Sequence, residues 1–143
     1  MAVLVYDAVA GVPASRDVPS GIDDLEFIAA WHSAHRCLDE TGDALPGGLR
    51  DVAMSGWETV AAAHAIALRY SDPLEAIGRA AASGGDTDTI ASIVGAIAGA
   101  RDGGAVFPRE LVERLSCHET LTRIVNDLWL ATTRQLNANS PET

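Results

Sequence analysis

Apolar residues recur every three or four positions along most of this chain. Between positions 22 and 39 the stripe consists of Leu25, Ile28, Trp31 and Leu38, with His35 on the same face. This spacing places side chains on one face of an α-helix, so it predicts a helix over 22–39. A segment rich in glycine and proline, 41–48, then predicts a loop.

Capping signatures mark the starts of further helices. The form Ser-x-x-Glu occurs at Ser55 and at Ser116, where the serine and glutamate side chains can satisfy free backbone N–H groups reciprocally. Asp72 places an acidic cap before Pro73, a residue suited to the first helical turn. These signatures and the helical spacing between them predict helices over 55–69, 72–82, 87–101, 108–115 and 116–135.

The pattern as a whole predicts an all-α fold. No segment shows convincing alternation with a period of two, and 3–6 is the one short strand candidate. We therefore expect a helical bundle of about six helices joined by short loops. We expect a single domain over 1–143, with a loose N-terminal arm at 1–20 and a frayed tail at 136–143.

Composition and charge exclude several classes of protein. The 143 residues are 48% apolar, which is enough for a compact core. The net charge of −10 disfavours a nucleic-acid partner, because phosphates need a concentrated basic face. Cys37 and Cys117 are far apart and form no CxxC motif, which argues against a disulfide framework or a zinc knuckle.

The same composition predicts no membrane partner and a cytoplasmic location. The longest apolar run, 90–100, has eleven residues, whereas a membrane span needs about 20. The N-terminus begins with an apolar stretch, but it lacks a basic leading region and Asp7 interrupts it, so a secretory signal is rejected.

An Asp-Thr-Asp-Thr stretch follows two glycines at the start of the apolar helix 87–101. Asp86, Asp88 and Thr89 carry hard oxygen donors, which suit Mg²⁺, Mn²⁺ or Ca²⁺ better than zinc or copper. Gly84 and Gly85 allow unusual backbone dihedrals and the close approach of a ligand. The alternative is purely structural, because Asp and Thr also cap helices without any metal.

Spacing excludes two known binding loops at this stretch. With Asp86 as the first position of an EF-hand, Ala91 falls where the glycine belongs and Ile97 where the bidentate glutamate belongs. No Gly-Lys-Ser/Thr follows the glycines, which excludes a P-loop.

Small residues recur every four positions on the helix behind this stretch, at Ala91, Gly95 and Gly99. Each glycine costs a helix about 1 kcal/mol relative to alanine. Two of them on one face predict a close approach that a side chain would block.

The segment "GGDTDTIASIVGAIAGARDGG" and the later "FP" resemble the C-terminal signature of the ADP-ribosylglycohydrolases. The preceding "SGWETVAAAHAIALRYSDPLEAIGRAAAS" also fits the pattern of that family, and the likeness covers about 55–115. The resemblance implies an all-α fold, like the C-terminal part of the family fold, with a pair of Mg²⁺ or Mn²⁺ ions. It also implies hydrolysis of the bond between ADP-ribose and a protein side chain or another acceptor.

Carried over to this sequence, the resemblance makes Asp86, Asp88 and Thr89 metal ligands, with Asp88 bridging two ions. Gly84 and Gly85 would then lie beside the substrate. Trp57 falls where the family carries an aromatic residue near the adenine, although a buried core tryptophan is at least as compatible with the sequence. No catalytic residue is assigned.

The N-terminal half of the family site is not found. A "GDAL" segment at 42–45 and an Asp pair at 23–24 occur in reversed order and without the family's flanking residues, so we interpret both as chance. The chain is therefore expected to be partial, and to act with a complementary chain. Self-association is also expected, because a half-fold exposes apolar surface. The alternatives are a non-catalytic ADP-ribose- or metal-binding module and a purely structural one.

Histidines and cysteines outside the motif suggest no second site. His32 and His35 are one helical turn apart, but Cys37 lies off that face and no fourth zinc ligand is apparent. His64 lies on an apolar stripe and is expected to be a satisfied core histidine. Cys117 lies beside a histidine, but no Asp or Asn completes a cysteine hydrolase.

Overall fold

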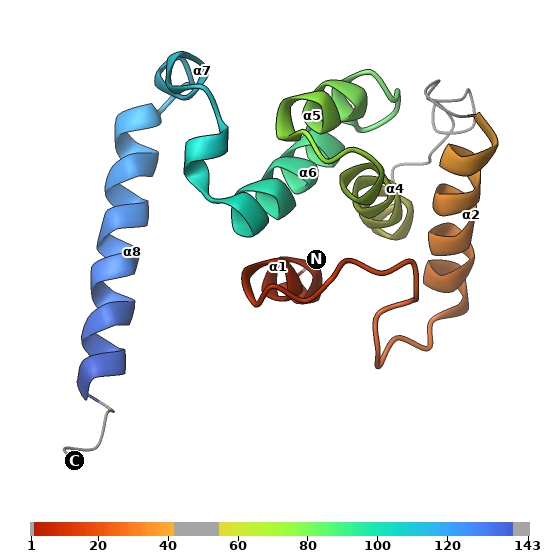
Figure 1. Cartoon of the computed structure of the whole chain (residues 1–143), viewed down its shortest axis with the longest axis horizontal. Coiled ribbons are helices and arrows are strands. Elements are labelled where there is room, and N and C mark those ends of the chain that lie inside the picture. The colour runs from red at the N-terminus through yellow and green to blue at the C-terminus, as the bar shows by residue number, and fades with distance from the viewer. Residues whose placement is uncertain (1, 42–54, 139–143) are drawn as a thin grey trace. The chain divides into compact units, whose positions relative to one another are not determined.

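The computed structural model describes residues 2–41 and 55–138, which form two compact units, Met1–Val106 and Phe107–Thr143. The helices of the first unit are α1 (Ala2–Val9), α2 (Leu25–Thr41), α4 (Gly56–Arg69), α5 (Pro73–Ala81), α6 (Thr87–Asp102) and the short 3₁₀ helix η1 (Gly104–Val106). Those of the second unit are α7 (Arg109–Glu113) and α8 (His118–Ala138). The described residues contain helices and no strand, which confirms the predicted all-α class (Figure 1).

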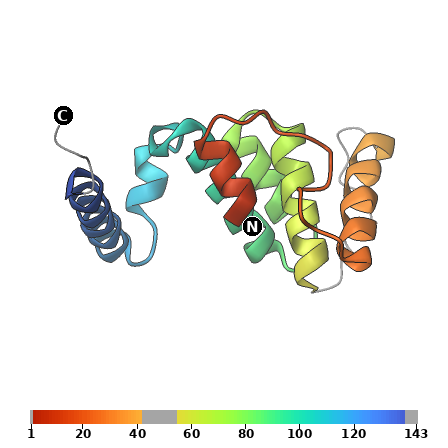
Figure 2. The ribbon, with the colours of Figure 1, turned by 90° about the horizontal axis from the view of Figure 1, so that it is seen from below.

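Helices α4 and α6 lie at the centre of the first unit (Figures 1 and 2). Helix α4 contacts α2, α5 and α6, and α6 also contacts α1 and α5. The fully buried side chains of this core include those of Trp31, Ile66, Ile90 and Val94. Each buried aliphatic side chain contributes about 1.5–3 kcal/mol through its removal from water. The buried run 61–67 of α4 is mostly alanine, which lets the neighbouring helices approach closely.

Two predicted helix starts form as expected. The Ser55 hydroxyl accepts the backbone N–H of Glu58 and donates to the Glu58 carboxylate at 2.7 Å. The glutamate therefore bonds the serine hydroxyl rather than the backbone N–H of Ser55 that the motif predicted. Asp72 caps α5 by accepting the N–H of Glu75 at 2.7 Å, with Pro73 as the first helical residue. Both caps satisfy donors that a helix leaves free at its N-terminus.

The N-terminal prediction of a strand at 3–6 is wrong, because these residues lie in α1. Leu4, Asp7 and Ala8 follow helical spacing and are buried or half-buried, with Leu4 joining the core. Helix α1 packs against α6, and the joining segment 10–24 then runs to α2 (Figure 2). The arm 1–20 is therefore not loose along its whole length.

The joining segment is tied to α2 by side-chain contacts. The indole Nε1 of Trp31 donates to the carbonyl oxygen of Arg16 at 2.8 Å. The Arg16 guanidinium also pairs with the carboxylate of Asp39, with one N···O distance of 2.9 Å. The joining segment is therefore held against the unit although it contains no helix.

The packing around Gly95 differs from the prediction. A Cβ atom placed on Gly95 would meet Cδ1 of Ile77 at 3.6 Å, which is an ordinary van der Waals distance. The neighbouring helix thus leaves room for a methyl group at this position. The prediction that a side chain would block a close approach is wrong for Gly95.

Helix α8 of the second unit begins later than its sequence signature predicted. Helix α8 starts at His118, and the carbonyl of Cys117 accepts the N–H of Leu121 at 2.9 Å, so Ser116 is not the cap. Tight turns between α7 and α8 bring the N–H of His118 to the carbonyl of Leu115 and delay the start. Cys117 has a φ of 64°, a left-handed value that is uncommon outside glycine.

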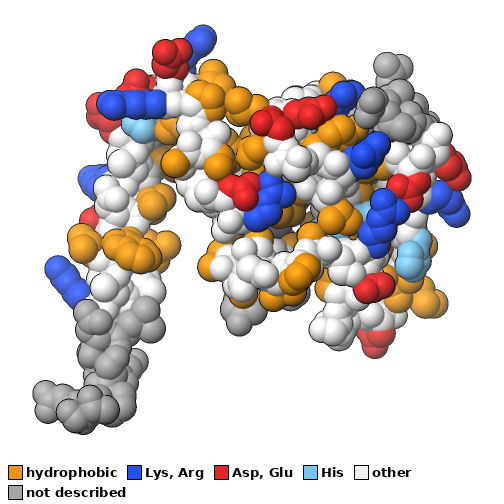
Figure 3. Space-filling model, in the orientation of Figure 1, with side chains coloured by type: hydrophobic (Ala, Val, Ile, Leu, Met, Phe, Trp, Pro, Cys, Tyr) orange, Lys and Arg blue, Asp and Glu red, His pale blue; other side chains and the backbone are white. Residues whose placement is uncertain are grey.

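Helix α8 exposes a large apolar surface (Figure 3). Its exposed apolar side chains are Leu121, Ile124, Val125, Leu128, Trp129 and Leu130. The predicted single domain over 1–143 therefore differs from the observed division into two compact units. Of the predicted frayed tail, 136–138 belong to α8, and 139–143 lie outside the described residues. No helix in the described part of the chain is long and apolar enough to cross a membrane.

Candidate functional site

The turn between α5 and α6 is built by two glycines in the left-handed region. Gly84 has a φ of 83° and Gly85 a φ of 71°, values that other residues rarely adopt. The preceding Ser83 is buried, and its hydroxyl donates to the carbonyl of Ala80 at 2.7 Å. The sequence Ser-Gly-Gly thus ends α5 and turns the chain sharply into α6. We name residues 84–89 the Asp turn.

Asp86 occupies the N-cap position of α6 without using its side chain as a cap. Its ψ is 62°, whereas the working caps Ser55 and Asp72 have ψ values of 139° and 122°. Only its backbone carbonyl takes part in the helix, by accepting the N–H of Ile90 at 3.0 Å. The structural alternative, in which Asp86 serves as a cap, is therefore not realised, and its carboxylate is left for another role.

The carboxyl groups of Asp86 and Asp88 lie within hydrogen-bonding reach of each other. The Asp86 carboxyl, followed by the backbone N–H groups of Thr89 and of Asp88 itself, lowers the pKa of Asp88. The side chain of Asp88 is exposed to solvent. Two adjacent carboxylates repel one another when both are ionised, so such a pair favours a shared proton or a bound cation.

The donor set of the Asp turn fits a hard cation in part. Asp86 and Asp88 supply carboxylates, and Thr89 supplies an exposed hydroxyl on the first turn of α6. Mg²⁺ and Mn²⁺ prefer such oxygen ligands and keep water in the remaining positions. No group of three or more His, Cys, Asp or Glu side chains arranged to hold a metal occurs within 2–41 and 55–138.

Trp57, the remaining residue assigned to the substrate, is not a core tryptophan. It lies in the first turn of α4 with 46% of its surface exposed. Its ring contacts Phe27 of α2 edge to face, with centroids 6.3 Å apart. An exposed indole is free to stack on a ligand. The aromatic contact of the Trp57 ring is therefore with α2 and not with the Asp turn.

The two N-terminal fragments that resembled family motifs have separate outcomes. Asp24 caps α2, because its carboxylate accepts the N–H of Phe27 at 2.9 Å. A capping role accounts for the presence of Asp24 without a metal, in line with our interpretation of the Asp pair at 23–24 as a chance resemblance. The "GDAL" segment at 42–45 lies outside the described residues.

A buried histidine pair is the feature that the sequence did not reveal. Nε2 of His35 lies 3.2 Å from Nδ1 of His64, although the two residues are 29 positions apart. His64 also stacks on Trp31, with ring centroids 4.3 Å apart. His64 is therefore a packed core histidine, as expected, but its partner is His35. The only sequence signal for the pair was that each histidine falls on the apolar stripe of its helix.

Burial lowers the pKa values of both histidines. The pKa of His64 falls to about 4, first because of desolvation and second because of His35. The pKa of His35 is lowered by desolvation and then by Arg16. Both rings are therefore neutral at neutral pH, and one donates its N–H to the other.

Comparison with known proteins extends the resemblance along the chain. The chain matches the sequence model of the ADP-ribosylglycohydrolase family over residues 1–138. The match includes the segment 55–115, on which the resemblance rested, and the N-terminal helices, where we had found little likeness. No curated protein and no solved structure gives a significant match.

Proposed function

Because this chain belongs to the ADP-ribosylglycohydrolase family, we propose that its Asp turn forms part of a Mg²⁺ or Mn²⁺ centre. In this proposal the centre serves hydrolysis of the bond between ADP-ribose and a protein side chain or another acceptor. The observation that carries the proposal is the geometry of Asp86. Its carboxylate makes no cap bond, and it lies beside the exposed carboxylate of Asp88 at the start of a helix.

Each residue of the Asp turn has a distinct role in this proposal. Asp86, Asp88 and Thr89 would hold the ions through their side-chain oxygens. Gly84 and Gly85 carry no side chain and have left-handed backbone conformations, so they let the ribose approach the turn. Bound divalent ions supply orientation of the ribose hydroxyls and activation of a water at the anomeric carbon. The exposed indole of Trp57 is available to stack on the adenine.

The site needs ligands beyond those of the Asp turn. Two carboxylates and one hydroxyl hold Mg²⁺ weakly, because the ion then keeps most of its waters. We propose that further acidic ligands and the base that acts on water come from a complementary chain. The positive charge of the bound ions would balance the two carboxylates of the Asp turn. It would also offset the repulsion between an anionic substrate and a protein of net charge −10.

Calorimetric titration with Mg²⁺ and Mn²⁺, with and without ADP-ribose, tests the metal site. The wild-type chain is expected to bind, and Asp88→Asn is expected to lose binding. Asp72→Asn is the matched control, since it also removes one exposed carboxylate at the start of a helix, and asparagine keeps a good cap there. Equal binding by Asp88→Asn and the wild type would show that the Asp turn holds no metal.

A non-catalytic ADP-ribose- or metal-binding module is the second candidate. It is favoured by the lack of a third acidic or histidine ligand among the described residues. Release of ADP-ribose from an ADP-ribosylated protein, measured with Mg²⁺ and the chain together with its complementary chain, separates the two. Binding of ADP-ribose without release supports the module, and release that Asp88→Asn abolishes supports the hydrolase.

A further inference from the structure

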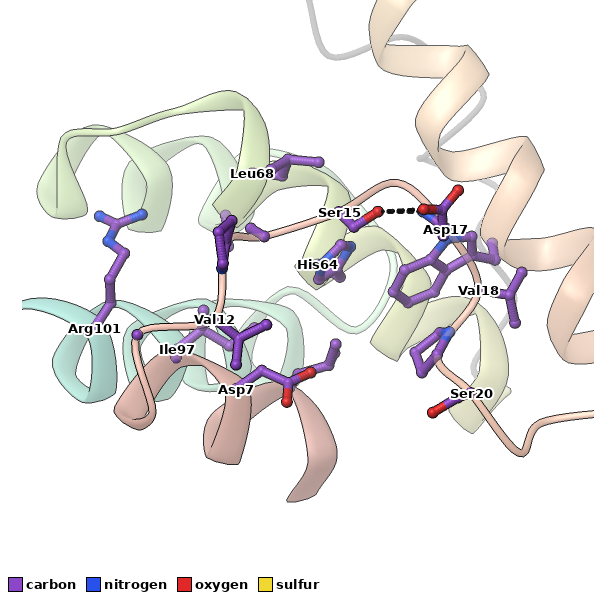
Figure 4. A pocket seen from close by; sticks show the side chains of 18 residues that line it. Asp7, Val12, Ser15, Asp17, Val18, Ser20, His64, Leu68, Ile97 and Arg101 are labelled. Atoms are coloured by element: carbon purple, nitrogen blue, oxygen red, sulfur yellow. Dashed lines mark hydrogen bonds between the residues drawn. The ribbon is translucent and has the colours of Figure 1, made fainter.

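A cavity in the first unit lies beneath the joining segment 10–24 (Figure 4). Its volume is about 460 Å³, which is within the usual range for small-molecule sites. Apolar side chains from four helices and the joining segment line it, among them Leu4, Val12, Val18, Trp31, Leu68 and Ile97. Ile97 is the first residue of α6 that lines the cavity. At 1.5 Å per residue, it lies about 12 Å from Thr89 along the helix axis. The cavity is therefore separate from the Asp turn.

The charged groups at this cavity disfavour an anionic ligand. Asp7 and Asp17 contribute carboxylates to the lining. Arg101 also lines it, but its guanidinium donates to the Asp102 carboxylate at 2.8 Å and to the Ser71 carbonyl at 2.9 Å. Its charge is matched within the protein. A phosphate or carboxylate in the cavity would therefore face an excess of negative charge.

His64 offers a neutral hydrogen-bonding group to the cavity. Its side chain is 6% exposed and lines the space that Figure 4 shows. Nδ1 is engaged with His35, and Nε2 makes no hydrogen bond with any other described residue. Because the ring is neutral, its tautomer decides whether Nε2 donates or accepts. The imidazole can therefore match either a ligand N–H or a ligand ring nitrogen.

The joining segment is held over this space rather than collapsed into it. The bond from Trp31 to the Arg16 carbonyl and the pairing of Arg16 with Asp39 fix the segment from the α2 side. On the α1 side, the N–H of Val12 donates to the carbonyl of Asp7 at 2.9 Å. Anchoring at both ends preforms the cavity, and a preformed site loses less entropy when it binds a ligand.

We propose that this cavity binds a neutral, planar heteroaromatic molecule whose ring nitrogen or N–H group hydrogen-bonds Nε2 of His64. A cavity of about 150 Å³ already holds a benzene ring, so the volume here accommodates two fused rings. The apolar lining packs against the ring faces, and the single neutral polar group orients the molecule. The ligand lacks a phosphate and is distinct from the substrate of the Asp turn.

Titration of the ¹⁵N-labelled full chain with indole, followed by NMR, tests the proposal. Saturable shifts are expected at the indole N–H signal of Trp31 and at the backbone of Val12. Ala8→Leu fills the cavity from α1 and is expected to weaken binding at least tenfold. Ala29→Leu, an equal change on the exposed face of α2, is expected to leave binding unchanged. Indole-3-acetate, which adds a carboxylate, is expected to bind at least tenfold more weakly than indole.

Three results would overturn the proposal: no saturable shift in the wild type, equal affinity in Ala8→Leu and Ala29→Leu, or equal binding of indole and indole-3-acetate. Melting curves first establish that each variant is folded. Should Ala8→Leu not fold, Ser20→Leu fills the same space from the exposed joining segment and carries the same expectation.

Discussion

Single side chains of this protein have roles that their neighbours in sequence do not reveal. His35 and His64 form one neutral pair between α2 and α4, held against the buried ring of Trp31. Asp86 and Asp72 both stand at helix N-caps, yet only Asp72 bonds a backbone N–H. At the scale of the residue, backbone dihedrals and burial therefore decide whether a polar group is structural or available for binding.

The histidine pair predicts loss of stability in mild acid. The folded pKa of His64 is about 4, below the unfolded value of about 6.5. Between these values the unfolded state binds more protons, so stability is full above the unfolded pKa and falls as pH drops toward the folded pKa. From about pH 7.5 to about pH 5 this group alone removes about 2 kcal/mol. Urea denaturation of the wild type and of His64→Gln at both pH values measures the effect.

The loss between the two pH values should be smaller in His64→Gln, which does not titrate at this position. His35 adds to the loss in the same direction, since its pKa is also lowered. An equal loss in the wild type and His64→Gln would contradict the assignment to His64.

Helices α4 and α6 organise the first unit because each contacts several other helices. Helix α4 buries a run of alanines, whereas α6 carries Gly95 opposite Ile77 of α5 with room for a methyl group. The left-handed glycines at 84 and 85 start α6, and Gly103, with a φ of 81°, ends it. At the scale of the element, the glycines at the ends are required by backbone conformation, whereas Gly95 is not.

Gly95→Ala is expected to stabilise the protein. The new methyl group meets Ile77 at an ordinary distance of 3.6 Å, and alanine favours a helix by about 0.5–1 kcal/mol over glycine. Thermal and urea unfolding should therefore show a higher free energy of unfolding by about this amount. Gly84→Ala is the contrasting variant, because its φ of 83° strains any side chain and the free energy of unfolding should fall. A destabilised Gly95→Ala would mean that α5 cannot accommodate the methyl group.

The two units differ in what they bury. Among the described residues, the buried apolar side chains, from Leu4 to Ala98, all lie in the first unit. The second unit consists of a short helix and α8, whose apolar side chains are exposed. Exposed apolar surface of this extent marks sites of association. At the scale of the molecule, the first unit holds the Asp turn and the cavity, and α8 is where we expect self-association.

A chain that ends after Val106 is expected to fold cooperatively and to remain monomeric. The full chain is expected to self-associate as its concentration rises, because α8 hides its apolar surface in that way. Circular dichroism during urea unfolding measures the first expectation, and sedimentation velocity over a range of concentrations measures the second. A strictly monomeric full chain, or a shortened chain that does not fold, would contradict this division of roles.

The sequence by itself determined the features that depend on residues within about one helical turn of each other. Local hydrogen bonding determines the caps at Ser55 and Asp72. Local dihedral preferences determine the turn at Gly84 and Gly85, and the residue types of the Asp turn provide its oxygen ligands. The resemblance to the family also rests on one contiguous segment. The Ser-x-x-Glu signature at Ser116 was the exception, because tight turns after α7 shifted the start of α8 to His118.

Only the tertiary structure decided which distant residues meet. His35 pairs with His64, which is 29 positions away, and Trp31 bonds the carbonyl of Arg16, which is 15 positions away. The apolar stripe of one helix does not indicate which other helix it will pack against. Burial within that packing, and not residue type, lowers the pKa of His64. The cavity beneath the joining segment likewise depends on how the chain folds back on itself, because helices far apart in the sequence enclose it. The ψ of 62° at Asp86, which leaves its side chain without a cap bond, is a torsion that the capping pattern did not reveal.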